Sequence, residues 1–114
     1  MDDIIAETAH ETGLDPATAR QGLGILIAFL LHGGQQAKVR ALVDRIPGAE
    51  QLAKESGGTA TGLIGVFSEL SAAGLGMGEM QALVRAFERA AKERVGAADV
   101  DAVIAGIPGL SQFV

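Results

Sequence analysis

The run LGILIAFLL, residues 23–31, decides the fold of this chain because it is the most apolar stretch in the sequence. Among its nine residues only Gly24 breaks the apolar character. The run is well short of the roughly 20 apolar residues that a membrane-spanning helix needs, so we expect no membrane span. It predicts instead a buried helix over residues 16–32, placed near the centre of a helical bundle.

Local signals mark the start of that helix. Asp15 is a favourable N-cap residue, and Pro16 fits the first helical position because its missing N–H has no helical partner there. Gly13 is suited to end a preceding helix, residues 3–12, in the left-handed conformation, and Leu14 supplies the apolar contact that accompanies such an end. The sequence therefore predicts a tight corner between two helices.

The chain repeats part of its own sequence. DRIPGAEQL, residues 44–52, returns sixty-one positions later as AGIPGLSQF, residues 105–113. Identities extend beyond this motif, which is typical of a duplicated unit rather than of a single chance match. The matched positions are Gly13, Leu14, Val39, Ala41, Ile46, Pro47, Gly48 and Gln51, paired with Gly74, Leu75, Val100, Ala102, Ile107, Pro108, Gly109 and Gln112. We therefore predict an internal duplication.

Helical periodicity recurs in both copies. Apolar residues are spaced as on one helix face, and in each copy they stop at a proline, which disfavours helical angles in the residue before it. They are Val39, Leu42, Val43 and Ile46, then Val100, Val103, Ile104 and Ile107. The predicted fold is all-α, a single compact domain over residues 1–114 with about six to eight helices. Its two pseudo-symmetric half-repeats are residues 1–56 and 62–114, joined by 57–61.

The two long second helices differ on one face, and this difference supplies the candidate contact residues. Arg85, Glu88, Arg89 and Lys92 predict a solvated face on the second copy. The corresponding positions of the first copy are Gly24, Ile27, Ala28 and Leu31. Leaving Ile27 and Leu31 in water would forgo roughly 1.5 to 3 kcal/mol each, so we expect this face to be covered. The cover is the other half of the same chain, a second copy of the protein, or an apolar ligand.

No motif in the sequence indicates catalysis. The chain has no cysteine, and Glu7, His10 and Glu11 form only one Glu-x-x-His face where a di-iron bundle needs two. The glycine-rich segments lack the remaining residues of phosphate-binding loops, and no serine lies in a G-x-S-x-G motif. We therefore expect no catalytic residue, no metal site and no cofactor.

A helix-turn-helix outline is present in ETGLDPATARQ, residues 11–21, where Thr18, Arg20 and Gln21 begin a candidate recognition helix. The apolar residues that follow do not suit a DNA groove. The net charge of −5 also disfavours binding to phosphates. The sequence therefore argues against nucleic acid as a partner. The acidic amino terminus lacks the features of a secretory signal, which favours a cytoplasmic location.

The Gly-Leu corner, the Gly- and Ala-rich helix and the Ile-Pro-Gly motif resemble those of an uncharacterised bacterial family named VcgC/VcgE. The resemblance covers residues 13–52 and again 74–113, and it implies an all-helical fold with no known activity, so no functional residue is carried over. The expected function is a non-enzymatic structural or protein-interaction module that acts through an apolar surface or by self-association. A small apolar-ligand or lipid-binding protein is the alternative, and helix-turn-helix DNA binding is the third reading.

Overall fold

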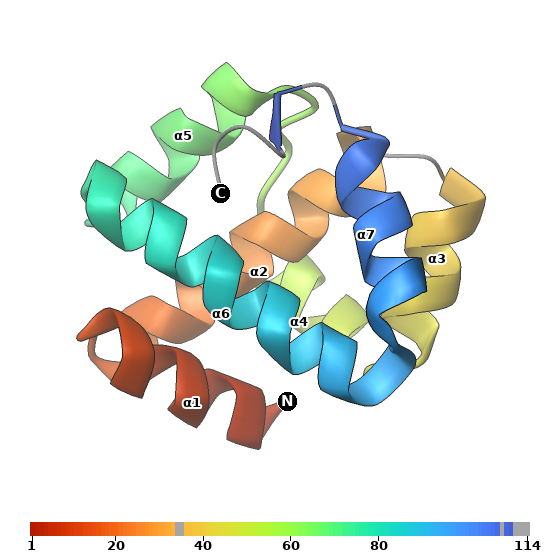
Figure 1. Ribbon diagram of the computed structural model, residues 1–114. Helices are drawn as coiled ribbons and strands as arrows, with labels where there is room; N and C mark the ends of the chain where they lie inside the picture. Colours follow the sequence, from red (N-terminus) through yellow and green to blue (C-terminus); the bar gives the residue numbers. More distant parts are fainter. Residues whose placement is uncertain (34–35, 108, 111–114) are drawn as a thin grey trace.

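The computed structural model describes residues 1–33, 36–107 and 109–110. Within these residues the fold is all-α, as the sequence predicts, with seven helices and no strand (Figure 1). The apolar residues buried in these helices form a single hydrophobic cluster. The helices are α1 (Asp2–Thr12), α2 (Pro16–Gly33), α3 (Gln36–Asp44), α4 (Ala49–Ser56), α5 (Leu63–Ala72), α6 (Met77–Val95) and α7 (Ala97–Ala105).

The corner between α1 and α2 has the predicted local structure. Gly13 is left-handed, with φ of 77°, and its N–H donates to the carbonyl oxygen of Ala9 at 3.0 Å. The carboxylate of Asp15 accepts a 2.7 Å hydrogen bond from the N–H of Thr18, which confirms the predicted N-cap. These local contacts fix where α1 ends and α2 begins.

The segment around the first Ile-Pro-Gly motif also follows the prediction, with one difference in length. Ile46 is buried, as expected for the last residue of an apolar face before a proline. Helix α3 ends at Asp44, two residues earlier than the periodicity suggests, and α4 follows from Ala49. In the second copy, Pro108 and residues 111–114 lie outside the described residues, so the match of Pro47 and Gln51 to Pro108 and Gln112 stays a prediction.

The order of helices repeats along the chain. Helices α5, α6 and α7 begin at residues 63, 77 and 97, each sixty-one positions after the starts of α1, α2 and α3 at residues 2, 16 and 36. The contacts between helices are also reciprocal between the two halves. Helix α1 contacts α6, its counterpart α5 contacts α2, and α3 contacts its own counterpart α7. Such reciprocal contacts are typical of two units related by a twofold axis. The internal duplication itself stays a prediction.

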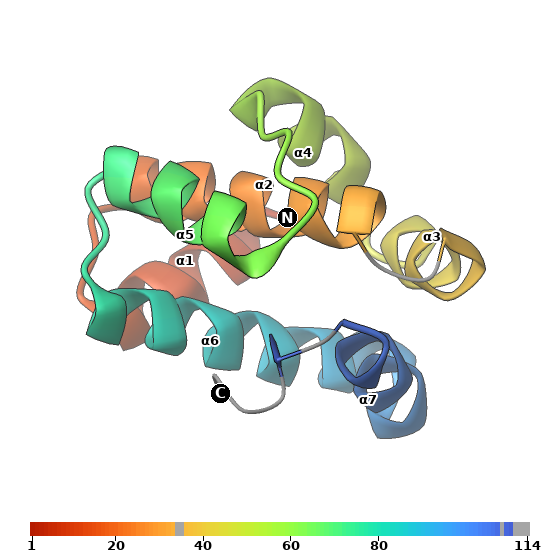
Figure 2. The ribbon, with the colours of Figure 1, turned by 90° about the horizontal axis from the view of Figure 1, so that it is seen from above.

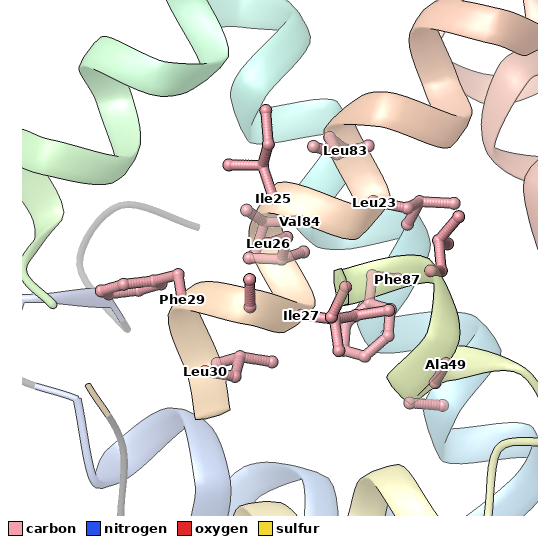
Figure 3. Close-up of a cluster of buried hydrophobic side chains, with 14 of the residues drawn as sticks. Leu23, Ile25, Leu26, Ile27, Phe29, Leu30, Ala49, Leu83, Val84 and Phe87 are labelled. Carbon is pink, nitrogen blue, oxygen red and sulfur yellow. The ribbon is translucent and has the colours of Figure 1, made fainter. Parts of the chain in front are cut away.

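Helix α2 is the central element of the bundle. Figure 2 shows α4 on one side of α2 and α6 on the other, and both helices contact it. From Gly22 to Leu30 every residue of α2 is buried. Figure 3 shows this region, in which side chains of α2, α4 and α6 gather in one cluster. The predicted central burial of the apolar run is therefore confirmed.

Candidate functional site

The small residues on the predicted contact face of α2 form the surface on which α4 packs. A Cβ atom added at Gly24 would lie 2.6 Å from the carbonyl oxygen of Leu52, so only glycine permits this approach. Ala28 lies against the connector after α4, since a Cβ atom at Gly58 would be 3.1 Å from the Ala28 methyl group. For Gly24 the cover is α4, in the same half of the chain, and for Ala28 it is the segment after α4, in the predicted join over residues 57–61. The sequence analysis had named the other half as the covering element within the chain, and for Gly24 and Ala28 this expectation is wrong.

The two large residues of the same face have different environments. Ile27 has no exposed surface, whereas Leu31, one turn later, is partly exposed at the end of the face. The structure thus brings all four predicted residues onto one side of α2, where the chain itself buries Gly24, Ile27 and Ala28. A contact of these residues with a partner or ligand stays a prediction.

Polar contacts also hold α4 on α2. The guanidinium group of Arg20 pairs with Glu55 at 2.6 Å, and the side-chain amide of Gln21 donates to the carbonyl oxygen of Ser56 at 3.0 Å. Two residues of the candidate DNA-recognition helix are therefore engaged within the chain. From Gly22 to Leu30 every residue of α2 is buried, so this part of the helix is not presented to a groove of DNA.

A groove opens where the face of α2 runs past the end of α4. We call it the α2–α3–α4 groove; its volume is about 380 Å³. Its apolar floor is formed by Ala28 and Leu31 of α2 and Ala53 of α4, and residues 57–59 line one side. Of the predicted contact residues, Ala28 and Leu31 thus reach this site and Gly24 and Ile27 do not.

Charged residues of α3 and α4 form the rim of the groove. The Oε1 atom of Glu50 lies 3.0 Å from Nη1 of Arg40 and 3.8 Å from Nζ of Lys54. The hydrogen bond from Arg40, and then the nearby positive charges, hold the pKa of the Glu50 carboxyl below its ordinary value. The carboxylate therefore stays ionised at neutral pH.

The carboxyl-terminal end of α2 completes the rim. The side-chain amide of Gln36 donates to the carbonyl oxygen of Leu31 at 3.1 Å, which satisfies one of the free carbonyl groups at the end of the helix. His32 is exposed and lines the groove. It belongs to the last turn of α2, beside this site.

The corresponding face of α6 is charged and solvated, as predicted. Arg85 and Arg89 are exposed. Lys92 lies 2.8 Å from Glu88 and 3.4 Å from Asp101, and the hydrogen bond from Lys92 to Glu88 is the main reason that the Lys92 pKa is raised. This face of α6 therefore provides no apolar packing surface comparable with that of α2.

The sequence analysis did not find Arg40, Glu50, Ala53 or Lys54. A signal was present, because Ala49, Leu52 and Ala53 give residues 49–56 an apolar face that must pack on another helix. The spacing of these apolar residues does not predict which helix they pack on. The groove exists only because α4 packs on α2 and α3 approaches both.

The predicted polar cluster on α1 has a structural partner. Glu11 forms an ion pair with Arg89 of α6. Among the described residues no group of three or more His, Asp or Glu side chains is arranged to hold a metal ion. In the same residues no single helix is both long and apolar enough to cross a membrane, although α1 and α2 together pass that test across a bend of 108°.

Comparison with known proteins gives no relative for this chain: no family model, no curated protein and no solved structure matches it. The resemblance to the VcgC/VcgE family therefore stays a prediction.

Proposed function

We propose that this chain is a non-enzymatic binding module whose contact site is the α2–α3–α4 groove. The observation that carries the proposal is the apolar floor of Ala28, Leu31 and Ala53 inside a groove of about 380 Å³. Ligand sites are concave, typically 300 to 1,000 Å³, and combine apolar walls with a few polar groups. This groove has both features.

Binding is favoured over catalysis by the state of the polar groups. Glu50 forms exposed ion pairs with Arg40 and with Lys54. Within the described residues neither histidine has a hydrogen bond to a carboxylate or a hydroxyl group, so neither belongs to a triad of nucleophile, base and orienting group. The apolar floor of the groove is suited to hold an apolar group of a ligand, and the charged rim is suited to position a polar group of the same ligand.

Self-association through the apolar face of α2 is the less favoured form of the proposal. That face is occupied by α4, so a second copy would have to displace α4 and break the Arg20 to Glu55 ion pair. DNA binding is supported less still, because Arg20 and Gln21 are engaged with α4. The groove remains open without any rearrangement.

Titration of the isotope-labelled full chain with 1-butanol tests the proposal by NMR. The backbone amides of Leu31, Ala53 and Gly58 should shift in a saturable manner. Leu31→Asn should weaken this binding, and Ile64→Asn, the same kind of change at a side chain that is 84% exposed on α5, should leave it unchanged. Shifts confined to other surfaces would overturn the proposal. Native mass spectrometry of the purified chain adds its stoichiometry and any retained small molecule.

A further inference from the structure

We infer that the occupant of the α2–α3–α4 groove is an aliphatic carboxylate, a small molecule with an apolar chain and one anionic end. This inference rests on the proposed binding function and adds the chemistry of the ligand. Its apolar part would lie on Ala28, Leu31 and Ala53, and its carboxylate would be received by Lys54 and Arg40.

The rim has more hydrogen-bond donors than acceptors. Within the described residues Glu50 is the only carboxylate within ion-pair distance of Arg40 or Lys54, and both cations contact its Oε1 atom. An arginine side chain has five N–H donors and a lysine side chain has three. One shared oxygen cannot satisfy them, so these donors are available to a second anion.

Lys54 is the cation best able to turn toward a ligand. Its nitrogen lies 3.8 Å from Glu50, the longer of the two contacts, and its side chain is 70% exposed. Exposed ion pairs of this type contribute little to stability, so Lys54 can exchange Glu50 for a ligand carboxylate at low cost. Arg40 keeps its 3.0 Å contact with Glu50, which holds the rim in place.

The charge at this site is opposite to that of the chain as a whole. The protein has a net charge of −5, yet the rim of the groove combines two cations with one carboxylate. An anionic ligand is therefore attracted to this rim despite the negative net charge of the chain. A neutral apolar molecule gains only the contact with the floor.

The test compares octanoate, 1-octanol and acetate as probes of the labelled full chain, with NMR shifts of the groove amides as the readout. Octanoate should bind about two- to fivefold more tightly than octanol, the range expected for one exposed ion pair, and acetate should bind far more weakly than either. Lys54→Met should remove the advantage of octanoate and leave octanol binding unchanged. The matched variant Lys38→Met, on the other side of α3, should leave both unchanged.

Each outcome separates the two proposals. Equal affinity of octanoate and octanol at the groove would overturn the inference about charge and leave the binding function standing. Failure of both to shift the groove amides would overturn both proposals. Octanoate binding that Lys54→Met and Lys38→Met weaken alike would show general attraction to positive charge, which also contradicts the inference. Lys54 and Lys38 are exposed, so neither variant is expected to disturb folding.

Discussion

Gly24 of α2 approaches Leu52 of α4 so closely that a Cβ atom at residue 24 would lie 2.6 Å from the Leu52 carbonyl oxygen. That oxygen belongs to the backbone of α4, so it cannot move away as a flexible side chain could. The closest contact between the two helices therefore depends on the absence of one methyl group. This relationship explains why a glycine stands within the most apolar helix of the chain.

Gly24→Ala is expected to destabilise the protein. Alanine is the better helix former by up to about 1 kcal/mol, but forcing a methyl group into a filled contact costs typically 1 to 3 kcal/mol. The clash should win, because a backbone oxygen must be displaced. Urea denaturation followed by circular dichroism measures the change. The control Gly78→Ala in α6, where a Cβ atom would meet nothing within 4 Å, should instead stabilise by about 0.4 to 1 kcal/mol.

Ile27→Arg is expected to unfold the protein rather than to alter an interface. Ile27 has no exposed surface, so the variant would bury an unpaired charge, a change that costs about 4 kcal/mol or more. Thermal melting and size-exclusion chromatography give the result. Ile64→Arg, at an exposed position, should stay within about 0.5 kcal/mol of the wild type. A folded Ile27→Arg protein of smaller oligomeric size would show that this side chain belongs to an interface.

Thr8→Val is expected to stabilise the protein. Thr8 is fully buried in α1, and its hydroxyl oxygen has no hydrogen-bond partner among the described residues. A buried hydroxyl without a partner costs about 1 to 3 kcal/mol, and valine has nearly the same shape without that group. Denaturation of the variant should show a gain of about 1 kcal/mol. Thr61→Val, at an exposed position, should change stability by less than about 0.5 kcal/mol, and an equal gain there would contradict the explanation.

The Asp15 cap predicts a pH dependence of stability at acid pH. The backbone hydrogen bond from Thr18 holds the pKa of Asp15 below its ordinary value of 3.8 in the folded chain. A carboxyl group with a lowered folded pKa stabilises the protein above its unfolded pKa, and this contribution is lost as the pH falls through the folded pKa. The melting temperature should therefore decrease below about pH 4 in part because this cap is protonated.

Asp15→Asn tests that contribution, because asparagine also caps helices but does not titrate. The variant should melt close to the wild type near neutral pH and show a shallower decrease of melting temperature between about pH 4 and pH 2. Parallel melts of both proteins across that range provide the comparison. An unchanged decrease in the variant would show that other carboxyl groups account for the acid sensitivity.

Local sequence was sufficient to predict the helices and several of their ends. Asp15, Pro16 and Gly13 act on backbone groups within a few residues, so their effect does not depend on the rest of the fold. The periodic apolar positions of α3 and α7 indicated which faces are buried, and Val39 and Val100 are indeed buried. The sequence alone thus determined an all-α chain with a buried central helix, because capping and periodicity are short-range properties.

Only the tertiary structure decided what covers that helix and where a site remains open. The hydrophobic effect is non-directional, so the sequence could show that Ile27 needs cover without showing which element supplies it. The glycine at position 24 marks a close approach, but Leu52 became its partner only through the packing of α4 on α2. In the same way, Leu31 meets the Arg40, Glu50 and Lys54 cluster only because three helices converge, a long-range arrangement that no local pattern encodes.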